Sequence, residues 1–249
     1  MLRAACAAET AVMSEHTLKF YGDELAGLKA EVMRLGGLAE QQVEDAVAAF
    51  ARRDVPLAQT LIGRDIRLDD LQRDIEKKAI RVIALRQPVA QDLRRAVAAM
   101  KMSLSLERTG DLAKNIAKRA VVIAEAEPMA PLTRSIERMG KMVAQRLRNA
   151  LDAYAAGELS GAMEVWAHDE EVDESYNALF RELLTYMMSD PRTIASCAHL
   201  LFIGKNLERI GDHATNIAEI IHYELTGEEI EGERPKWQDV DIRVSDGDA

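Results

Sequence analysis

A twelve-residue segment of this chain, LERTGDLAKNIA at residues 106–117, occurs again as LERIGDHATNIA at residues 207–218. Nine of the twelve positions are identical, and the two copies lie 101 residues apart. Two glycines earlier in the units are separated by nearly the same interval: Gly36 and Gly140 are 104 residues apart. Matching segments at this constant interval indicate that one structural unit of about a hundred residues is present twice.

Composition and periodicity predict that each unit is helical. The chain is 48% hydrophobic but only 4% aromatic, and long segments lack Gly and Pro, which favours an all-α protein. Apolar residues recur every three to four positions between Pro and Gly breaks. Asp54 is expected to cap the second helix, with Pro56 in its first turn. We predict three helices over about 20–51, 54–86 and 89–125, and three more around 136–151, around 165–183 and from about 191 onward.

These helices predict two tandem, pseudo-symmetric three-helix bundles. The first bundle is expected over residues 17–127 and the second over residues 128–227. Residues 1–16 make a poor signal peptide and are expected to form a disordered N-terminal extension, within which Met13 offers an alternative start. Residues 228–249 are rich in Glu, Asp, Gly and Pro without an apolar period, so they are expected to form an acidic mobile tail.

Charge and cysteine content exclude several classes of protein. The formal net charge of -10 argues against a nucleic-acid binder. The chain has two cysteines and no CxxC motif, which is typical of a reducing compartment and predicts a cytoplasmic protein. No apolar run reaches the length of about 18 residues that a membrane-spanning helix needs, so we expect any membrane association to be peripheral.

The repeated segment places acidic side chains on one helix face. Glu107 and Asp111 are four residues apart and Asn115 continues the same side. The apolar stripe upstream shares their register, which puts both carboxylates at the core or its edge. Buried acids are costly without compensation, so these two require a cation or a protein partner. The stripe consists of Leu93, Val97, Met100 and Leu104.

Each unit contains a second [DE]xxxD pair on its middle helix, in the apolar register. If the middle and third helices of a unit are neighbours, four carboxylates meet at one place. Clusters with only oxygen ligands suit Mg²⁺, Mn²⁺, Ca²⁺ or iron better than a structural Zn²⁺. We therefore predict bound divalent or trivalent metal ions, whether Mg, Mn, Fe or Zn. The predicted ligands are Asp65, Asp69, Glu107, Asp111, Asp169, Asp173, Glu208 and Asp212. Ion pairs with Arg108, Arg209, Lys114 or Lys205 are the alternative that the residues leave open.

Glycine and histidine positions add two further expectations. Gly110 and Gly211 each precede a predicted ligand and cost helix stability, which predicts the close approach of another helix.

Glu219 and His222 form the one ExxH pair of the chain, whereas a ferritin-like di-iron enzyme needs two such pairs. No nucleotide-binding loop or nucleophile elbow is present. We predict no catalytic residue, with a carboxylate-bridged di-metal redox protein or a metal-buffering bundle as the alternative function.

Four motifs together resemble those of the PhoU family. They are the two LER[TI]GD..NI segments, VMRLGGLAEQQ at residues 32–42, RQPVAQDLR at residues 86–94 and YMMSDPRTI at residues 186–194. The resemblance covers about residues 17–226. It implies a pair of three-helix bundles related by a pseudo-twofold axis, and multinuclear metal clusters held by the eight acids named above.

The resemblance also implies a function that composition and spacing do not. PhoU-like proteins are cytoplasmic, non-enzymatic regulators that keep the phosphate-starvation response off when phosphate is plentiful. The implied partners are a sensor histidine kinase and the ATPase subunit of the phosphate ABC transporter. We also expect a homodimer that binds no nucleic acid and reaches the membrane only through these partners.

Overall fold

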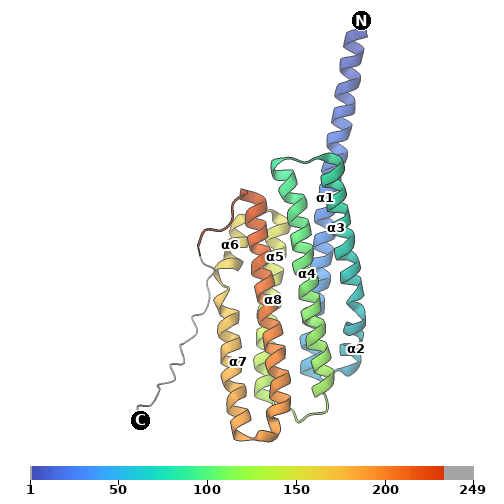
Figure 1. Cartoon of the computed structure of the whole chain (residues 1–249). Coiled ribbons are helices and arrows are strands. Elements are labelled where there is room, and N and C mark those ends of the chain that lie inside the picture. Colours follow the sequence, from blue (N-terminus) through green and yellow to red (C-terminus); the bar gives the residue numbers. More distant parts are fainter. Residues whose placement is uncertain (1, 233–249) are drawn as a thin grey trace, which may run out of the picture.

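The computed structural model describes the backbone of residues 2–232 and the side chains of residues 22–232, and within these bounds the chain is helical without strands (Figure 1). The elements are α1 (Leu2–Arg52), α2 (Val55–Arg64), α3 (Ile66–Arg86), α4 (Ala90–Ile123), α5 (Ala130–Ala156), α6 (Leu159–Ala167), α7 (Glu170–Ser189), η1 (Pro191–Thr193) and α8 (Ile194–Thr226). The all-α prediction is therefore confirmed. None of the described helices is long and apolar enough to pass through a lipid bilayer.

Both middle helices of the repeat are interrupted, which the periodicity did not indicate. The predicted helix over residues 54–86 is divided at Asp65 into α2 and α3, and its counterpart is divided at His168 and Asp169 into α6 and α7. At the first break the carbonyl of Asp65 accepts hydrogen bonds from the amides of Leu68 and Asp69 at 2.9 and 3.3 Å. Each break therefore places an acidic residue directly before a new helix.

Local signals set the start of α2 and the end of α5. Asp54 caps α2 as predicted, because its Oδ1 accepts a hydrogen bond from the amide of Leu57 at 2.9 Å, and Pro56 lies in the first turn. Gly157 ends α5 with φ of 69°, a left-handed conformation that costs other residues more.

The predicted core face of α4 is wrong. Leu93 and Leu104 of the expected stripe are 38% and 49% exposed, whereas Ala99, Met102 and Leu106 are buried. The error has a physical cause, since α4 packs against α1, α3 and α8 at once and close packing on several sides favours alanine over leucine. Glu107 and Asp111 accordingly lie at the edge of the core and are partly exposed.

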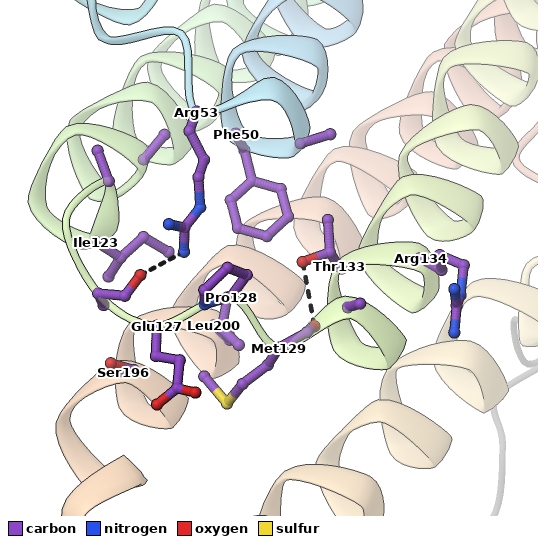
Figure 2. A pocket seen from close by; sticks show the side chains of 15 residues that line it. Phe50, Arg53, Ile123, Glu127, Pro128, Met129, Thr133, Arg134, Ser196 and Leu200 are labelled. Atoms are coloured by element: carbon purple, nitrogen blue, oxygen red, sulfur yellow. Dashed lines mark hydrogen bonds between the residues drawn. The ribbon is translucent and has the colours of Figure 1, made fainter.

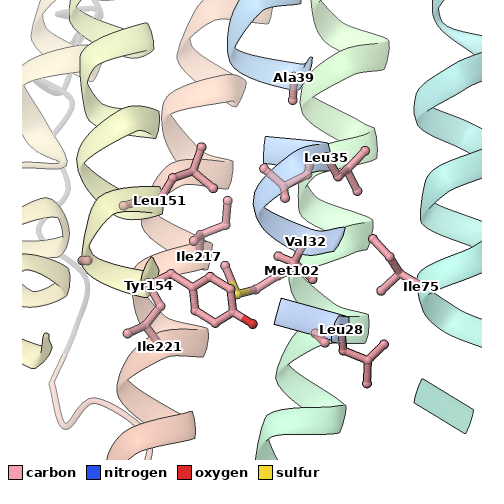
Figure 3. Packing of buried hydrophobic residues seen from close by; sticks show 14 of the residues in the cluster. Leu28, Val32, Leu35, Ala39, Ile75, Met102, Leu151, Tyr154, Ile217 and Ile221 are labelled. Atoms are coloured by element: carbon pink, nitrogen blue, oxygen red, sulfur yellow. The ribbon is translucent and has the colours of Figure 1, made fainter. Parts of the chain in front are cut away.

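The two repeat units share their hydrophobic cores. One hydrophobic cluster combines α1, α3 and α4 of the first unit with α5, α6 and α8 of the second. The other combines α1, α2 and α4 of the first unit with α5, α7 and α8 of the second. Figure 3 shows Val32 and Met102 of the first unit close to Tyr154 and Ile217 of the second. The two repeat units therefore share one hydrophobic core and form a single packed body.

Reciprocal glycine contacts join α1 to α5. A Cβ atom on Gly36 would lie 2.4 Å from a methyl of Leu151, and one on Gly140 would lie 2.6 Å from a methyl of Val47. Val47 and Leu151 are 104 residues apart, as are the two glycines. Each contact is thus the image of the other, as a pseudo-twofold axis between α1 and α5 requires.

The N-terminal segment differs from expectation. Residues 2–16, predicted to be a disordered extension, form the first turns of α1, which project beyond the other helices (Figure 1). This segment is rich in alanine and contains neither Gly nor Pro, a composition that favours helix. The Cys6 side chain, and residues 233–249 of the predicted acidic tail, lie outside what the structure describes.

Candidate metal centres

The first group of predicted ligands forms where α3 begins beside α4. Asp65 lies at the break before α3, Asp69 in the first turn of α3, and Glu107 and Asp111 on α4. Gly110 allows the approach that was predicted, because a Cβ there would lie 2.5 Å from a methyl of the α3 residue Leu68. Helix α3 therefore meets the acidic edge of α4 directly.

The four acids of this first cluster interact electrostatically. Burial raises the pKa of the Glu107 carboxyl above its ordinary value, and the nearby negative charges of Asp111, Asp69 and Asp65 raise it further, against a smaller opposite effect of Arg108. The prediction that the two [DE]xxxD pairs of a unit face each other therefore agrees with the first cluster.

An internal cation lies within the first cluster. The ammonium of Lys114 donates hydrogen bonds to Oδ2 of Asp65 and, at 2.8 Å, to Oδ1 of Asp111. Gln42 of α1 donates to the other oxygen of Asp65 at 3.4 Å and to the carbonyl of Gly110 at 3.2 Å. Burial lowers the pKa of Lys114, but the hydrogen bonds to the two aspartates outweigh it and leave the pKa raised. Lys114 is therefore charged and neutralises Asp65, which is only 5% exposed.

The second group of predicted ligands, called the second cluster, lies where α7 begins beside α8. Asp169 lies at the break before α7 and is 3% exposed. A guanidinium nitrogen of Arg146 on α5 lies 3.6 Å from Oδ1 of Asp169 and donates to its backbone carbonyl at 3.2 Å. The hydroxyl of Thr215 on α8 donates to the same Oδ1 at 2.6 Å. Asp169 thus receives its compensating charge from α5.

The remaining predicted ligands of this cluster border the α7–α8 contact. Asp173 lies in the first turn of α7, while Glu208 and Asp212 lie on α8. A Cβ on Gly211 would lie 3.2 Å from a methyl of Val172, so the second predicted close approach is confirmed as well. Lys205 donates to Oε1 of Glu208 at 2.6 Å.

In each cluster a buried glutamate oxygen is left without a hydrogen bond from the described residues. Oε2 of Glu107 and Oε2 of Glu208 are buried and accept no hydrogen bond from the residues that the structure describes. The side chains of Arg108 and Glu107 form an ion pair at 3.6 Å, beyond hydrogen-bonding distance. Since a buried acceptor without a donor is costly, these two oxygens are the atoms that an added cation would satisfy.

The described residues do not form a closed ligand set. Among them, no three Asp, Glu, His or Cys side chains are grouped so that they could hold an ion as they stand. Three of the four basic residues named as the alternative form pairs with the clusters, namely Lys114, Lys205 and Arg108. Metal binding at the eight acids therefore remains a prediction.

Replacing Glu107 by glutamine tests the electrostatics of the first cluster. Because the folded-state pKa of Glu107 is raised, the ionised carboxylate destabilises the fold at neutral pH. Glu107→Gln should therefore raise the free energy of unfolding of chelator-treated protein at neutral pH. This advantage should shrink as the pH falls through the raised pKa and vanish below about 4.5, the ordinary value. Urea unfolding across this pH range measures the difference.

A residue with the opposite pKa shift provides the control. Hydrogen bonds from Arg192 hold the pKa of Asp190 below its ordinary value, so Asp190→Asn should lower stability at neutral pH and lose this effect in acid. A Glu107→Gln variant that is less stable than the wild type at neutral pH would contradict the prediction.

The ExxH pair is engaged in other contacts. Oε1 of Glu219 accepts a hydrogen bond from the indole of Trp166 at 3.3 Å, and Nδ1 of His222 lies 2.9 Å from the carbonyl of Glu228. These contacts support no role for the pair as metal ligands.

A separate cavity of about 300 Å³ lies under the connection between α4 and α5 (Figure 2). Arg53 spans it by donating to the carbonyl of Ala126 at 2.5 Å, and Phe50, Ile123 and Leu200 form apolar walls. None of the eight predicted ligands lines this cavity.

Three residues that contact the buried aspartates were not predicted from the sequence, namely Gln42, Arg146 and Thr215. A signal for them was present. Gln42 and Arg146 are 104 residues apart, the interval of the first helices of the units, and Lys114 and Thr215 occupy one of the three positions at which the repeated segments differ.

Comparison with known proteins identifies the family. The family model described as the PhoU domain matches residues 32–120 and again residues 136–221. The chain is 68% identical over 224 residues to the phosphate-specific transport system accessory protein PhoU homolog of Caulobacter vibrioides, covering 90% of this chain and 97% of that protein. The corresponding Rhizobium meliloti homolog is 48% identical over 221 residues, covering 89% of this chain and 93% of that protein.

Solved structures agree with these relatives. The crystal structure of PhoU from Pseudomonas aeruginosa matches with a TM-score of 0.81 at 37% identity, covering 84% of this chain and all of that one. The phosphate transport system regulatory protein PhoU of Streptococcus pneumoniae matches with a TM-score of 0.79 at 30% identity, covering 85% of this chain and all of that one. With both halves of the repeat matched in sequence and in fold, this chain belongs to the PhoU family.

Proposed function

We propose that this protein is an accessory protein of a phosphate-specific transport system that regulates phosphate uptake and represses the phosphate-starvation response. The observation that supports this proposal is the name shared by two relatives, of which this chain matches 97% and 93% of the length. The fold is compatible with this proposal, because long helices joined by short connections give extended surfaces for docking other proteins. In this proposal the protein acts in the cytoplasm as a homodimer.

The proposed mechanism is that of a metal-dependent adaptor between a sensor histidine kinase and the ATPase subunit of the transporter. The eight acids would hold the ions, with Glu107 and Glu208 supplying the two buried oxygens that lack hydrogen bonds. Bound cations would neutralise the acidic edges of α4 and α8 and bridge them to acidic groups of a partner. We assign no catalytic step to any side chain.

Genetic complementation tests the regulatory and metal-binding parts together. Disrupting the gene should derepress phosphate-scavenging functions in phosphate-rich medium, and the wild-type gene should restore repression. A variant in which the acid pair on α4 and the acid pair on α8 are both neutralised should fold but should fail to restore repression. That variant carries Glu107→Gln, Asp111→Asn, Glu208→Gln and Asp212→Asn.

A charge-matched variant separates the clusters from general acidity. It neutralises four exposed acids outside the clusters, and it should restore repression like the wild type. The acids are Asp70, Asp74, Asp152 and Glu164. Normal repression in the disrupted strain would refute the regulatory role. Full complementation by the cluster variant would refute the metal-binding part alone.

A further inference from the structure

Large apolar side chains are exposed on the paired helices α7 and α8. Phe180, Leu184 and Met188 follow one another at intervals of four residues, which places them on one side of α7, and they are 38%, 41% and 84% exposed. Ile194 on α8 is 49% exposed, and Leu201, seven residues later on the same side, is partly buried. We call these five residues the second-unit patch.

The register of the two helices joins these residues into one surface. Helices α7 and α8 are connected by the short η1 and pack against each other as antiparallel neighbours (Figure 1). The ammonium of Lys205 lies 5.2 Å from the centre of the Tyr176 ring. Four residues onward along α7 and four residues back along α8 lead to Phe180 and Leu201. These two are therefore neighbours, and the same register continues toward Ile194.

The first unit has an equivalent surface, the first-unit patch. Ile80 on α3 and Leu93 on α4 are 51% and 38% exposed. They lie 104 and 101 residues before Leu184 and Ile194, the intervals of the repeat. The α4 stripe that the periodicity assigned to the core is thus apolar on its outer side, and α8 repeats it. Exposed apolar patches of this kind are typical of interaction sites. The first-unit patch consists of Ile80, Leu93, Val97 and Met100.

Basic side chains border the second-unit patch and are its outermost charges. In the pair of Arg192 with Asp190 the two side chains are 90% and 36% exposed, and in the pair of Lys205 with Glu208 they are 48% and 14% exposed. The cation is the more exposed partner each time. An approaching molecule therefore meets positive charge here, although the chain as a whole has a net charge of -10.

The first-unit patch has the same arrangement. Arg95, two residues after Leu93, is 47% exposed and its partner Asp92 is 38% exposed. Further along α4, Arg108 is 59% exposed and Glu107 is 19% exposed. Contact between such patches on two copies of this chain would bring cations against cations, which is unfavourable, whereas carboxylates of a different partner would complement them.

The shape of the second-unit patch suits a helix. From Phe180 to Met188, α7 rises by about 12 Å at about 1.5 Å per residue. Apolar residues every three to four positions on an amphipathic helix can pack on such a surface along two or three turns. Insertion into a lipid surface instead favours side chains that project fully from the protein, and Phe180 and Leu184 remain more than half covered.

We infer that the second-unit patch docks an amphipathic helix of a partner protein, apolar on one face and bordered by Asp and Glu. This inference rests on the proposed adaptor function and names the surface and the partner chemistry for it. The first-unit patch is the weaker of the two, because Glu76 and Ala84 occupy the positions of Phe180 and Met188 in the repeat.

Peptide binding to the full chain tests the inference. The probe is a fluorescein-labelled synthetic amphipathic helix with Leu on one face and Glu beside it, and fluorescence anisotropy measures its binding. A matched peptide has Lys in place of every Glu. The wild-type protein should bind the Glu peptide in preference to the Lys peptide. Phe180→Lys combined with Leu184→Lys should lower the affinity for the Glu peptide by about tenfold or more, as expected for the loss of buried anchors.

A second double variant provides the control. Leu38 and Val122 are 39% and 63% exposed and lie outside both patches. Leu38→Lys combined with Val122→Lys adds the same charge and should leave the affinity for the Glu peptide unchanged. All four replaced side chains are exposed, so both variants should fold, which circular dichroism checks. In the complementation assay the Phe180 and Leu184 variant should fail to restore repression and the control should restore it.

Several results would overturn the inference. Binding of the Glu peptide no tighter than that of the Lys peptide, or equally tight to the Phe180 and Leu184 variant, would refute docking at this patch and leave the regulatory role intact. Normal repression in the disrupted strain would instead refute the regulatory role itself.

Two further measurements exclude other occupants of the patch. If sedimentation shows a wild-type dimer that dissociates in the Phe180 and Leu184 variant, a second copy of the chain covers the patch. If the wild type binds vesicles containing phosphatidylserine and this variant does not, a membrane covers it. Either result would overturn the inference, whereas unchanged sedimentation and vesicle binding in the variant would support it.

Discussion

Replacing Arg146 by methionine should lower the free energy of unfolding by about 3–5 kcal/mol, the usual loss when one partner of a buried ion pair is removed. Methionine replaces the aliphatic part of the arginine side chain and carries no charge, so the change leaves Asp169 buried without its cation. The hydroxyl of Thr215 would still donate to Asp169 but cannot neutralise it. Urea unfolding at neutral pH in the presence of chelator measures the loss.

Two comparisons show whether the loss arises from the unpaired charge. Adding Asp169→Asn to Arg146→Met should recover a large part of the stability, because the amide carries no charge to leave unpaired. Arg148, two residues away, pairs with Glu44 at 2.9 Å but its side chain is 45% exposed, so Arg148→Met should change stability by about 1 kcal/mol or less. If the two arginine variants lose the same stability, the proposed importance of burial is wrong.

Truncating Leu147 to alanine should lower the free energy of unfolding by about 2–5 kcal/mol, because it opens a cavity in a fully packed core. Leu147 lies on α5, yet its cluster includes residues of α1, α3 and α4. We expect one cooperative unfolding transition. Amide hydrogen exchange should accelerate in α1 and α4 as well as in α5.

Leu104 provides the control for this variant. It lies on α4 and is 49% exposed, so Leu104→Ala should change stability by about 0.5 kcal/mol or less. Two separate transitions in the Leu147 variant, with protection lost only in α5 to α8, would show that the two units fold independently and that the shared core contributes little.

The shared core gives physical meaning to the repeat. In both hydrophobic clusters, the buried residues of one unit pack against buried residues of the other. Neither unit therefore has a separate core of its own. The reciprocal contacts of Gly36 and Gly140 bring α1 and α5 close along the pseudo-twofold axis. The two acidic clusters are therefore connected by packed helices rather than by a flexible linker.

The family, the all-α class and the division into two similar units were predictable from the sequence, because they depend on local and repeated patterns. Helix caps such as Asp54 and the close-contact glycines Gly110 and Gly211 were predictable for the same reason. The core face of α4 was not, since a helix packed on several sides has no single apolar stripe to detect. The breaks at Asp65 and Asp169 were also missed, because the apolar period continues through them.

The sequence by itself determined that eight acids recur in two matched sets and that the burial of any of them would need compensation. The tertiary structure alone decided which residues provide it, since Lys114 and Arg146 lie 49 and 23 residues from the aspartates that they neutralise. Helical periodicity relates residues three or four apart on one helix. Only the packing of α4 against α3, and of α5 beside the start of α7, brings the opposite charges into contact.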